Sequence, residues 1–497
     1  MGRTVARQVT ILVVLAAAAF AFLAAFATRH GFFDLKVYYG ATNYWAHGHG
    51  EIYDYLKPLS KYGYTYPPFA ALTMLPMAIL PWTVTIIVSV AATVLVTLLI
   101  IYWFLRPVIA RFNWTPWFTL AVAAILAAVF EPLRETVNFG QVNMLLVFLV
   151  VADLILLVYD RPSAAPNSPA RRWGGVGIGL ATAIKLTPGV FILYLLLARK
   201  WRAAVVSIAT TGAATLVAAI VAPHASLIFW SSAVFDTDRV GSLSYISNQS
   251  LEGVAARINP DQPSNVVWGL MIIAVLVVWV WQLRRSLRLG DELAGLALTG
   301  VLGCLVSPVT WVHHLVWLLP AMLLLTARGL TATGRRRTRL LLLDLGLYVL
   351  LSSKLVWRFD NHFTGWGAIL SDSYVIASVV LLVCLPLSAA GRPAASGDAG
   401  PAPSEPASSR PSSDALAPGH LTSDALASDD LAQEDLAPDR LASGGSRSAR
   451  AVGVADLGQF DRAAVDAPDR VAGGGAVGPE AEPRVEPAGG VVRFQHP

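Results

Sequence analysis

Long apolar runs follow one another along the first 390 residues of this 497-residue chain. Each covers roughly 15 to 24 residues, and a run of about 18 or more is typical of a membrane-spanning helix. Helices are the expected form, because backbone polar groups inside a bilayer must find partners within their own segment. Only 14% of the residues are charged, against about 25% in soluble domains. We therefore predict an all-α polytopic membrane protein and exclude a soluble domain.

Twelve spans are predicted from the apolar runs. The pair within 174–199 is too short for two full crossings and is interpreted as a tilted or re-entrant hairpin. The first run is longer than the apolar region of a usual signal peptide, so we expect an uncleaved anchor, although Ala25-Phe26-Ala27 resembles a cleavage site. The twelve spans are 9–27, 82–105, 117–131, 142–159, 174–186, 187–199, 203–222, 266–283, 293–306, 310–327, 340–353 and 373–390.

Basic residues indicate the orientation, because cytoplasmic loops carry an excess of Lys and Arg. With a cytoplasmic N-terminus every inside loop is basic, whereas the outside loops hold few basic residues, such as Arg134 and Lys354. Both termini are therefore predicted to be cytoplasmic, and the net charge of +5 is interpreted as topology rather than nucleic-acid binding. The inside residues are Arg3, Arg7, Arg106, Arg111, Arg161, Arg171, Arg172, Arg199, Lys200, Arg202, Arg284, Arg285, Arg288, Arg328, Arg335, Arg336, Arg337 and Arg339.

Two domains differ in composition. Residues 1–390 form the predicted membrane domain. Residues 391–497 are rich in Ala, Pro, Ser, Gly and Asp, and we predict a disordered cytoplasmic tail. The two cysteines, Cys304 and Cys384, both lie inside apolar runs, so we expect two small buried hydrophobic side chains rather than a disulfide or a zinc site.

Polar and ionisable side chains gather where the predicted spans meet the outer surface, and in a membrane protein such groups indicate function. Asp34 follows the first span and precedes an amphipathic surface helix expected over residues 38–45. Its carboxylate could act as a general base. It could equally cap the helix that follows, and the residues alone leave both interpretations open.

Three further segments at the outer side combine polar groups with helix ends. Tyr66 precedes a proline pair that predicts a rigid extended entry into the membrane. Residues 131–143 are interpreted as a short outside turn, which either binds a sugar or merely connects two spans. Lys185 stands between apolar residues, where its charge is expected either to bind an anion, such as a lipid phosphate, or to extend to the membrane–water interface.

His313 and His314 lie where another helix is expected to begin at the outer surface. Adjacent helical residues point about 100° apart, so the two rings are not expected to chelate one metal, and one of them could donate to a phosphate oxygen. Asn248 and Gln249, in the second long outside loop, form a weaker polar cluster.

Together these segments resemble the polyprenol-phosphate-sugar-dependent mannosyltransferases of actinobacterial cell envelopes, which are membrane glycosyltransferases of the GT-C class. The resemblance extends over roughly residues 28–325 and rests on the order and spacing of six motifs. These are Asp34 with Tyr38, Tyr66-Pro67-Pro68, Gly140-Gln141-Val142-Asn143, Lys185 with Pro188, Asn248-Gln249-Ser250, and Ser307-Pro308 with Trp311, His313 and His314.

The resemblance implies a reaction and a site. The donor would be mannose on a polyprenyl phosphate, and the acceptor a lipid-anchored mannoside of the lipomannan, lipoarabinomannan or phosphatidylinositol mannoside type on the outer face. Transfer would invert the anomeric carbon and form an α linkage, expected to be α-1,2. The family's base maps to Asp34, and a single displacement needs only one such carboxylate.

The same resemblance suggests roles for the other polar residues. Lys185, His313 and His314 are expected to bind the donor phosphate, which gains from a nearby cation or hydrogen-bond donor as it departs. No metal or other cofactor is expected. The expected substrate-binding residues are Tyr38, Tyr66, Gln141, Asn143, Asn248, Gln249 and Trp311.

Three alternatives stay open at this point. Some relatives transfer arabinofuranose from a polyprenyl phosphate, and the sequence does not show the sugar pocket. A lipid-linked sugar transporter or flippase would also place polar groups in its spans, although the matched halves common in transporters are not evident. A scaffold would depend on residues 391–497.

Overall fold

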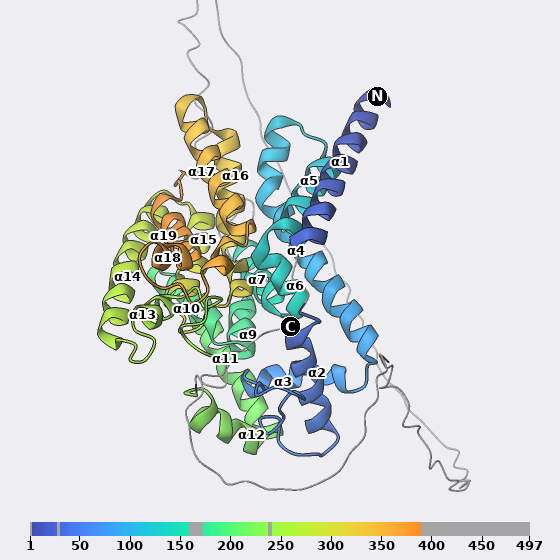
Figure 1. The fold of residues 1–497 in the computed structure, drawn as a ribbon, viewed down its shortest axis with the longest axis vertical. Helices are drawn as coiled ribbons and strands as arrows, with labels where there is room; N and C mark the ends of the chain where they lie inside the picture. Colours follow the sequence, from blue (N-terminus) through green and yellow to red (C-terminus); the bar gives the residue numbers. More distant parts are fainter. Residues whose placement is uncertain (1, 27–29, 159–171, 237–240, 389–497) are drawn as a thin grey trace, which may run out of the picture. The chain divides into compact units, whose positions relative to one another are not determined.

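Helices dominate the residues that the structure, a computed structural model, describes: 2–26, 30–158, 172–236 and 241–388 (Figure 1). The isolated bridge between Leu56 and Gly63 is the only β-type pairing among them. These residues belong to one unit of the chain, Met1–Ala402. The all-α prediction is confirmed for this part, whereas the predicted tail, residues 391–497, lies outside the described residues.

The helices fall into long, short and broken elements. The long ones are α1 (Gly2–Phe26), α4 (Trp82–Phe112), α11 (Trp201–Val221), α14 (Asn265–Arg288) and α17 (Gly334–Ser352). The shorter α-helices are α2 (Phe33–Ala46), α3 (Pro68–Met74), α5 (Pro116–Val129), α6 (Glu131–Phe139), α7 (Asn143–Ala152), α9 (Val176–Ile184), α10 (Val190–Leu197), α12 (Pro223–Ile228), α13 (Leu251–Ile258), α15 (Glu292–Val306), α16 (Leu319–Thr331), α18 (Trp366–Ser371) and α19 (Ser373–Cys384). Tighter or wider turns are η1 (Leu75–Ala78), η2 (Asp153–Val158), η3 (Thr187–Gly189), η4 (Phe229–Ala233), η6 (Val312–Leu318) and η7 (Leu355–Phe359).

Five helices are long and apolar enough to cross a bilayer, and the bent pair α5 and α6 would add a sixth. The five are Thr4–Phe26, Trp82–Phe112, Trp201–Val221, Asn265–Arg288 and Val312–Thr331. The predicted count of twelve spans is therefore not confirmed within the described residues. The pair predicted to be too short for two full crossings, within 174–199, contains α9 and α10, whose 9 and 8 residues extend only about 12–14 Å at 1.5 Å per residue. That is less than half of a hydrocarbon core of about 30 Å.

The segment expected to be a short outside turn, residues 131–143, is instead mostly the helix α6. It leaves α5 at an angle of 72°, because Pro132 in its first turn lacks the N–H that would continue α5. The helix buries Glu131, Arg134 and Glu135. The prediction of a turn is therefore wrong, and these three polar side chains lie inside the protein rather than at its surface.

The described residues form two hydrophobic cores, which share packing residues. The larger core centres on α15, whose residues are almost all buried and whose neighbours are α10, α14, α16, α19 and η6. The smaller core joins α2, α3 and α12 with the connecting residues 52–66, and these helices lie together in Figure 1. Val142 and Ile184 pack against both cores. The residues next to them, Gln141 and Lys185, therefore lie at the seam between the two cores.

The free cysteines differ in their surroundings. Cys304 is buried in α15, as predicted. Cys384 is exposed as the last residue of α19, so the prediction of two buried cysteines is wrong for this residue, because it faces away from the core at a helix end.

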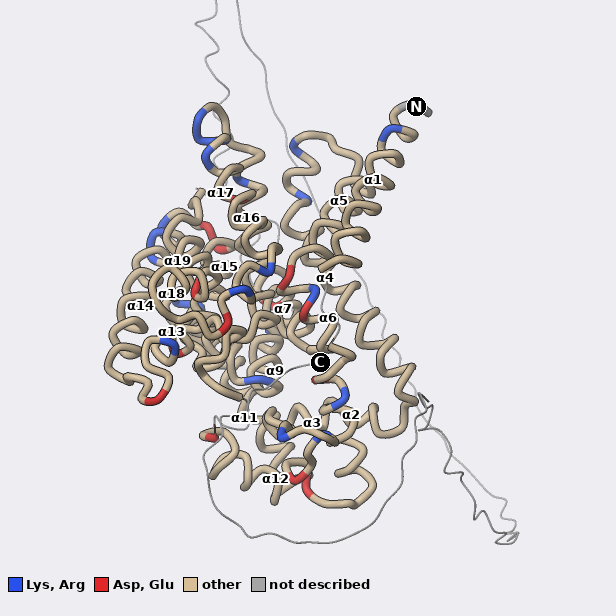
Figure 2. The backbone as a smooth tube through the Cα atoms, in the orientation of Figure 1, with Lys and Arg blue, Asp and Glu red and all other residues tan. Residues whose placement is uncertain are grey.

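Basic side chains gather at one end of the helices. Figure 2 shows that Lys and Arg in the connection from α4 to α5 and in the connection from α16 to α17 lie at the same end as the N-terminus of α1. The helices α2 and α3 lie toward the opposite end. This distribution has the asymmetry that the positive-inside rule uses.

Candidate functional site

Asp34 is the second residue of α2, and contacts to the end of α6 fix where that helix begins. Gly31 and Phe32 both adopt left-handed backbone conformations, with φ of 57° and 58°. The backbone N–H of Phe32 donates to the carbonyl of Asn138 over 2.9 Å. No side chain caps the N-terminus of α2, so the structure gives Asp34 no capping bond and favours the other interpretation of this residue.

The Asp34 carboxylate accepts a hydrogen bond from Gln141 Nε2 over 2.7 Å. Gln141 reaches this position because α6 ends in a Schellman motif: Gln141 N–H donates to the Thr136 carbonyl, and Gly140 N–H donates to the Val137 carbonyl. Gly140 has a φ of 70°, which glycine adopts without strain. The turn brings a residue 107 positions away in sequence against Asp34.

A chain of hydrogen bonds orients the Gln141 amide. Tyr38 donates from its hydroxyl to the Tyr66 hydroxyl over 2.9 Å, and the Tyr66 hydroxyl donates to Gln141 Oε1 over 2.9 Å. Because Oε1 accepts from Tyr66, the amide nitrogen must face Asp34. The bond from Gln141 is the only hydrogen bond to the Asp34 carboxylate among the described residues. One of its oxygens therefore stays available for a substrate hydroxyl.

Burial raises the pKa of Asp34 from 3.8 to about 6, and this effect outweighs three opposing ones. The hydrogen bond from Gln141 lowers the pKa, as do the charges of Lys185 and His30. A carboxylate with a pKa near 6 is mostly ionised at neutral pH and accepts a proton more readily than an ordinary aspartate.

Lys185 follows the last residue of α9, Ile184, and has an extended backbone conformation. Its side chain meets the chain of hydrogen bonds at Tyr66. Its ammonium contacts three neutral groups: His314 Nε2 at 2.9 Å, Asn143 Oδ1 at 3.2 Å and the Tyr66 hydroxyl at 3.4 Å. It also lies 5.2 Å from the centre of the Tyr66 ring. No carboxylate in the described ranges lies within ion-pair distance of it. Lys185 is thus a half-buried cation with acceptors but no counter-ion in contact.

The two histidines stand in η6, with ring centroids 4.6 Å apart and planes at 89°. His314 Nε2 lies 2.9 Å from Lys185 Nζ, and His314 Nδ1 accepts a hydrogen bond from the backbone N–H of Trp311 over 3.2 Å. His313 is buried, and its Nε2 has no hydrogen-bond partner in the described part of the chain. Its carbonyl accepts from Thr136 and Asn143, which ties η6 to α6 and α7.

The structure therefore brings eight of the predicted residues into one region joined by the contacts above: Asp34, Tyr38, Tyr66, Gln141, Asn143, Lys185, His313 and His314. It also indicates more specific roles than substrate binding for several of them. Gln141, Tyr66 and Tyr38 hold Asp34, and Asn143 holds Lys185 and η6.

Asn248 and Gln249 have a different environment. Both side chains are fully buried. Asn248 donates to the carbonyls of Leu243 and Pro308, while Gln249 donates to those of Ile246 and Ser371. These hydrogen bonds to backbone carbonyls fix the loop. The two side-chain amides therefore serve the structure of the loop rather than sugar binding. The Trp311 ring contacts that of Tyr245, with centroids 6.0 Å apart.

One pair was missed by the sequence interpretation. His30 Nε2 lies 2.8 Å from Glu135 Oε2, and the His30 ring stacks on Phe139 at 4.0 Å. In the sequence, the position of His30 four residues before the candidate base could have drawn attention to this histidine. Its partner Glu135 is 105 positions away, so only the fold reveals the pair. The pair adds to the contacts that hold the start of α2 against α6.

Metal ligands do not gather in the described ranges: no three His, Cys, Asp or Glu side chains lie together there as a metal would need. The expectation of a reaction without a cofactor stays a prediction.

Comparison with known proteins places this geometry in context. The model of glycosyltransferase family 87 matches residues 64–308, so Asp34 precedes the matched segment. A protein of Mycobacterium tuberculosis (strain ATCC 25618 / H37Rv), named polyprenol-phosphate-mannose-dependent alpha-(1-2)-phosphatidylinositol mannoside mannosyltransferase, is 32% identical over 348 residues. The match covers 66% of this chain and 77% of that relative.

Two further relatives differ in coverage. A polyprenol-phosphate-mannose-dependent alpha-(1-2)-phosphatidylinositol pentamannoside mannosyltransferase of Mycolicibacterium smegmatis is 29% identical, over 72% of this chain and 86% of the relative. An alpha-(1->3)-arabinofuranosyltransferase of M. tuberculosis is 31% identical over only 35% of this chain and 38% of the relative. No solved structure matches the chain significantly.

Proposed function

Because the chain belongs to glycosyltransferase family 87 and is a membrane glycosyltransferase, we propose that it transfers mannose from polyprenyl-phosphate-mannose to a lipid-anchored mannoside. The linkage formed is α-1,2 and the anomeric carbon inverts. The acceptor is a phosphatidylinositol mannoside or a related lipoglycan. The observation that carries this proposal is Asp34, a partly exposed carboxylate of raised pKa, held by Gln141 across from the unneutralised ammonium of Lys185.

Asp34 acts as the general base in this proposal. Its free oxygen takes the proton from the acceptor hydroxyl as that oxygen forms a bond to the anomeric carbon of mannose. The bond from this carbon to the phosphate oxygen breaks, and its electron pair leaves with the polyprenyl phosphate. One carboxylate suffices for such a single displacement, whereas a double displacement needs a second.

Lys185 binds the departing phosphate. The charge on that group grows as the bond breaks, so a fixed cation lowers the barrier more than it strengthens ground-state binding. Lys185 has only neutral partners, and a phosphate would complete its environment. His313, with its unpartnered Nε2, is a second group that a phosphate or sugar oxygen can engage.

The choice of mannose over arabinofuranose rests on the extent of similarity. The mannosyltransferases match about two thirds of this chain, and the arabinofuranosyltransferase about one third. Membership of a glycosyltransferase family also argues against the transporter and scaffold alternatives.

Transfer assays with the purified protein test the proposed function. The protein is incubated with a short-chain polyprenyl-phosphate-mannose and phosphatidylinositol mannosides; methylation analysis determines the linkage position of the product, and NMR determines its anomeric configuration. We expect a new α-1,2-linked mannose and no product from the matched arabinofuranosyl donor. Transfer of arabinose in place of mannose would contradict the donor assignment, and a product of retained configuration would contradict the mechanism.

We also propose that both termini are cytoplasmic and that Asp34 faces the outer side of the plasma membrane. The basic connections at the end opposite α2 support this orientation. Single cysteines at Lys61 and Arg336, in a chain whose two natural cysteines are replaced by serine, provide the test. A membrane-impermeant maleimide should label the cysteine at position 61 in intact cells and leave position 336 unlabelled. The reverse pattern would invert the topology.

A further inference from the structure

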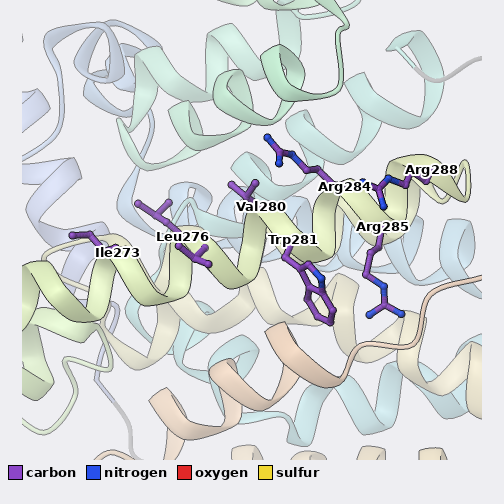
Figure 3. A pocket seen from close by; sticks show the side chains of 8 residues that line it. Ile273, Leu276, Val280, Trp281, Arg284, Arg285 and Arg288 are labelled. Atoms are coloured by element: carbon purple, nitrogen blue, oxygen red, sulfur yellow. The ribbon is translucent and has the colours of Figure 1, made fainter.

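A basic groove runs along α14, apart from the site described above. Two adjoining hollows of about 460 and 540 Å³ share Val280, Arg284 and Arg288. Figure 3 shows the apolar side chains of the first hollow followed along the helix by Trp281 and three arginines. We call these two hollows the α14 groove. Their remaining lining residues are Ile273, Leu276, Val277 and Arg285 on the first side, and Leu196, Leu197, Ala198, Arg199, Trp201, Leu283 and Leu287 on the second.

Two of the arginines at the end of the groove, Arg284 and Arg288, have no hydrogen-bond or ion-pair partner among the described residues. Arg284 and Arg288 are four residues apart, so their side chains lie on one face of the helix. Both are exposed, and neither makes a hydrogen bond or ion pair with any described residue. Arg285 differs, because its guanidinium lies 4.6 Å from the centre of the Trp281 ring and donates to Gln282.

The two acidic residues that follow α14 are already occupied. Asp291 pairs with Arg328 at 2.6 Å, and Glu292 pairs with Lys200 at 2.9 Å. No anion among the described residues therefore contacts Arg284 or Arg288. The general preference for basic residues at helix C-termini and at the cytoplasmic interface explains their presence. It does not explain why both line a groove whose other lining residues are mostly apolar.

The groove has the length of one bilayer leaflet. The eleven residue steps from Ile273 to Arg284 amount to about 16 Å at 1.5 Å per residue, close to half of a hydrocarbon core of about 30 Å. Trp281 and Trp201 are 54% and 60% exposed beside the arginines, and tryptophan is enriched at the membrane interface. The apolar part thus lies at acyl-chain depth, and the arginines at headgroup depth.

We infer that the α14 groove is a binding site for an anionic glycerophospholipid, whose phosphate contacts Arg284 and Arg288 while an acyl chain lies along Ile273, Leu276 and Val280. Basic pockets between membrane helices favour anionic headgroups. A zwitterionic headgroup brings a cation toward two arginines and is disfavoured. This site is independent of the proposed mannosyl transfer.

Binding to the delipidated protein in detergent tests the inference, with native mass spectrometry and thermal unfolding as readouts. Phosphatidylglycerol should bind and stabilise the protein, whereas phosphatidylcholine of the same acyl chains should not. The double variant Arg284→Ala/Arg288→Ala should lose affinity for phosphatidylglycerol by roughly 30-fold, which is the expected effect of two basic residues near a membrane surface.

The matched control is Arg335→Ala/Arg336→Ala, which removes the same charge from exposed positions at the start of α17. It should bind as the unaltered protein does, and an equal loss in this variant would overturn the site. Arg284→Lys/Arg288→Lys keeps both charges and should retain most of the preference. Equal binding of phosphatidylcholine, or equal stabilisation by inorganic phosphate alone, would also overturn the inference. If the alanine variant does not fold, added salt decides: the affinity of the unaltered protein for phosphatidylglycerol must fall as salt rises.

Discussion

At the scale of single residues, Asp34 ends a chain of neutral hydrogen-bonding groups, and no cation of the described residues forms an ion pair with it at contact distance. Such surroundings leave the carboxylate basic, because desolvation is only partly offset by Gln141 and by the charges of Lys185 and His30. A strong ion pair would have lowered its pKa and weakened it as a base. The arrangement therefore suits proton abstraction at neutral pH.

The pKa of Asp34, about 6, predicts the pH dependence of transfer. The base works only when ionised, so kcat/KM should rise about tenfold per pH unit below 6 and level off above it. Gln141→Leu removes a hydrogen bond that lowers this pKa, so the inflection should move to higher pH. A pH profile of kcat/KM for both proteins measures this, and an unmoved inflection would contradict the role given to Gln141.

Asp34→Asn should reduce transfer by about 10²- to 10⁴-fold, the usual contribution of a general base. The substitution keeps the size of the side chain and removes its ability to take a proton. Turnover is measured on purified protein, and insertion is checked by its thermal unfolding. Near-normal turnover would remove Asp34 from the reaction.

Lys185→Ala should raise the KM for the donor more than the KM for the acceptor. The ammonium has no acidic partner in contact, and the donor phosphate is the anion that the reaction supplies. A drop in kcat is also expected, because charge on the leaving phosphate grows toward the transition state. Steady-state kinetics with a short-chain donor measures kcat and the KM of each substrate. An effect limited to the acceptor KM would contradict the proposed contact between Lys185 and the donor phosphate.

At the scale of elements, the site depends on how α2 docks against the end of α6. A Cβ added at Gly140 would lie 2.5 Å from Leu35 Cβ, and the φ of 70° disfavours any side chain. Gly140→Ala should therefore push α2 away, lower the unfolding temperature and reduce transfer, with a backbone cost of about 1–2 kcal/mol alone. Thermal unfolding and turnover of the purified variant measure both effects.

The control for this substitution is Gly346→Ala in α17, where an added Cβ meets nothing within 4 Å. This variant should be as stable as the unaltered protein or slightly more stable, by about 0.5–1 kcal/mol, as expected when alanine replaces glycine within a helix. If Gly140→Ala behaves in the same way, the docking of α2 does not depend on close approach at this residue.

At the scale of the whole molecule, we propose that the chemistry belongs to the membrane domain and faces outward, whereas the tail is predicted to be cytoplasmic. Removal of residues 391–497 should therefore leave transfer in membranes close to that of the full chain. Membrane preparations with matched amounts of inserted protein provide the measurement. A truncated protein that is abundant, inserted and inactive would contradict the prediction and give the tail a role in the reaction.

The sequence by itself determined the class of the fold and most members of the site. Apolar runs dictate helices because the backbone in lipid has no other partners, and polar groups beside such runs indicate function because they are costly there. Asp34, Lys185 and the two histidines were evident for this reason, and the order of the motifs indicated the family.

Only the tertiary structure decided which of these residues act together and which helices are long enough to cross a membrane. The contact between Asp34 and Gln141 joins positions 107 residues apart, and that between Lys185 and His314 joins positions 129 apart. Asn248 and Gln249 looked available in sequence, yet the backbone takes their hydrogen bonds. Apolar runs do not encode where a helix breaks or whose polar atoms are already satisfied, because both depend on the neighbours that packing brings together.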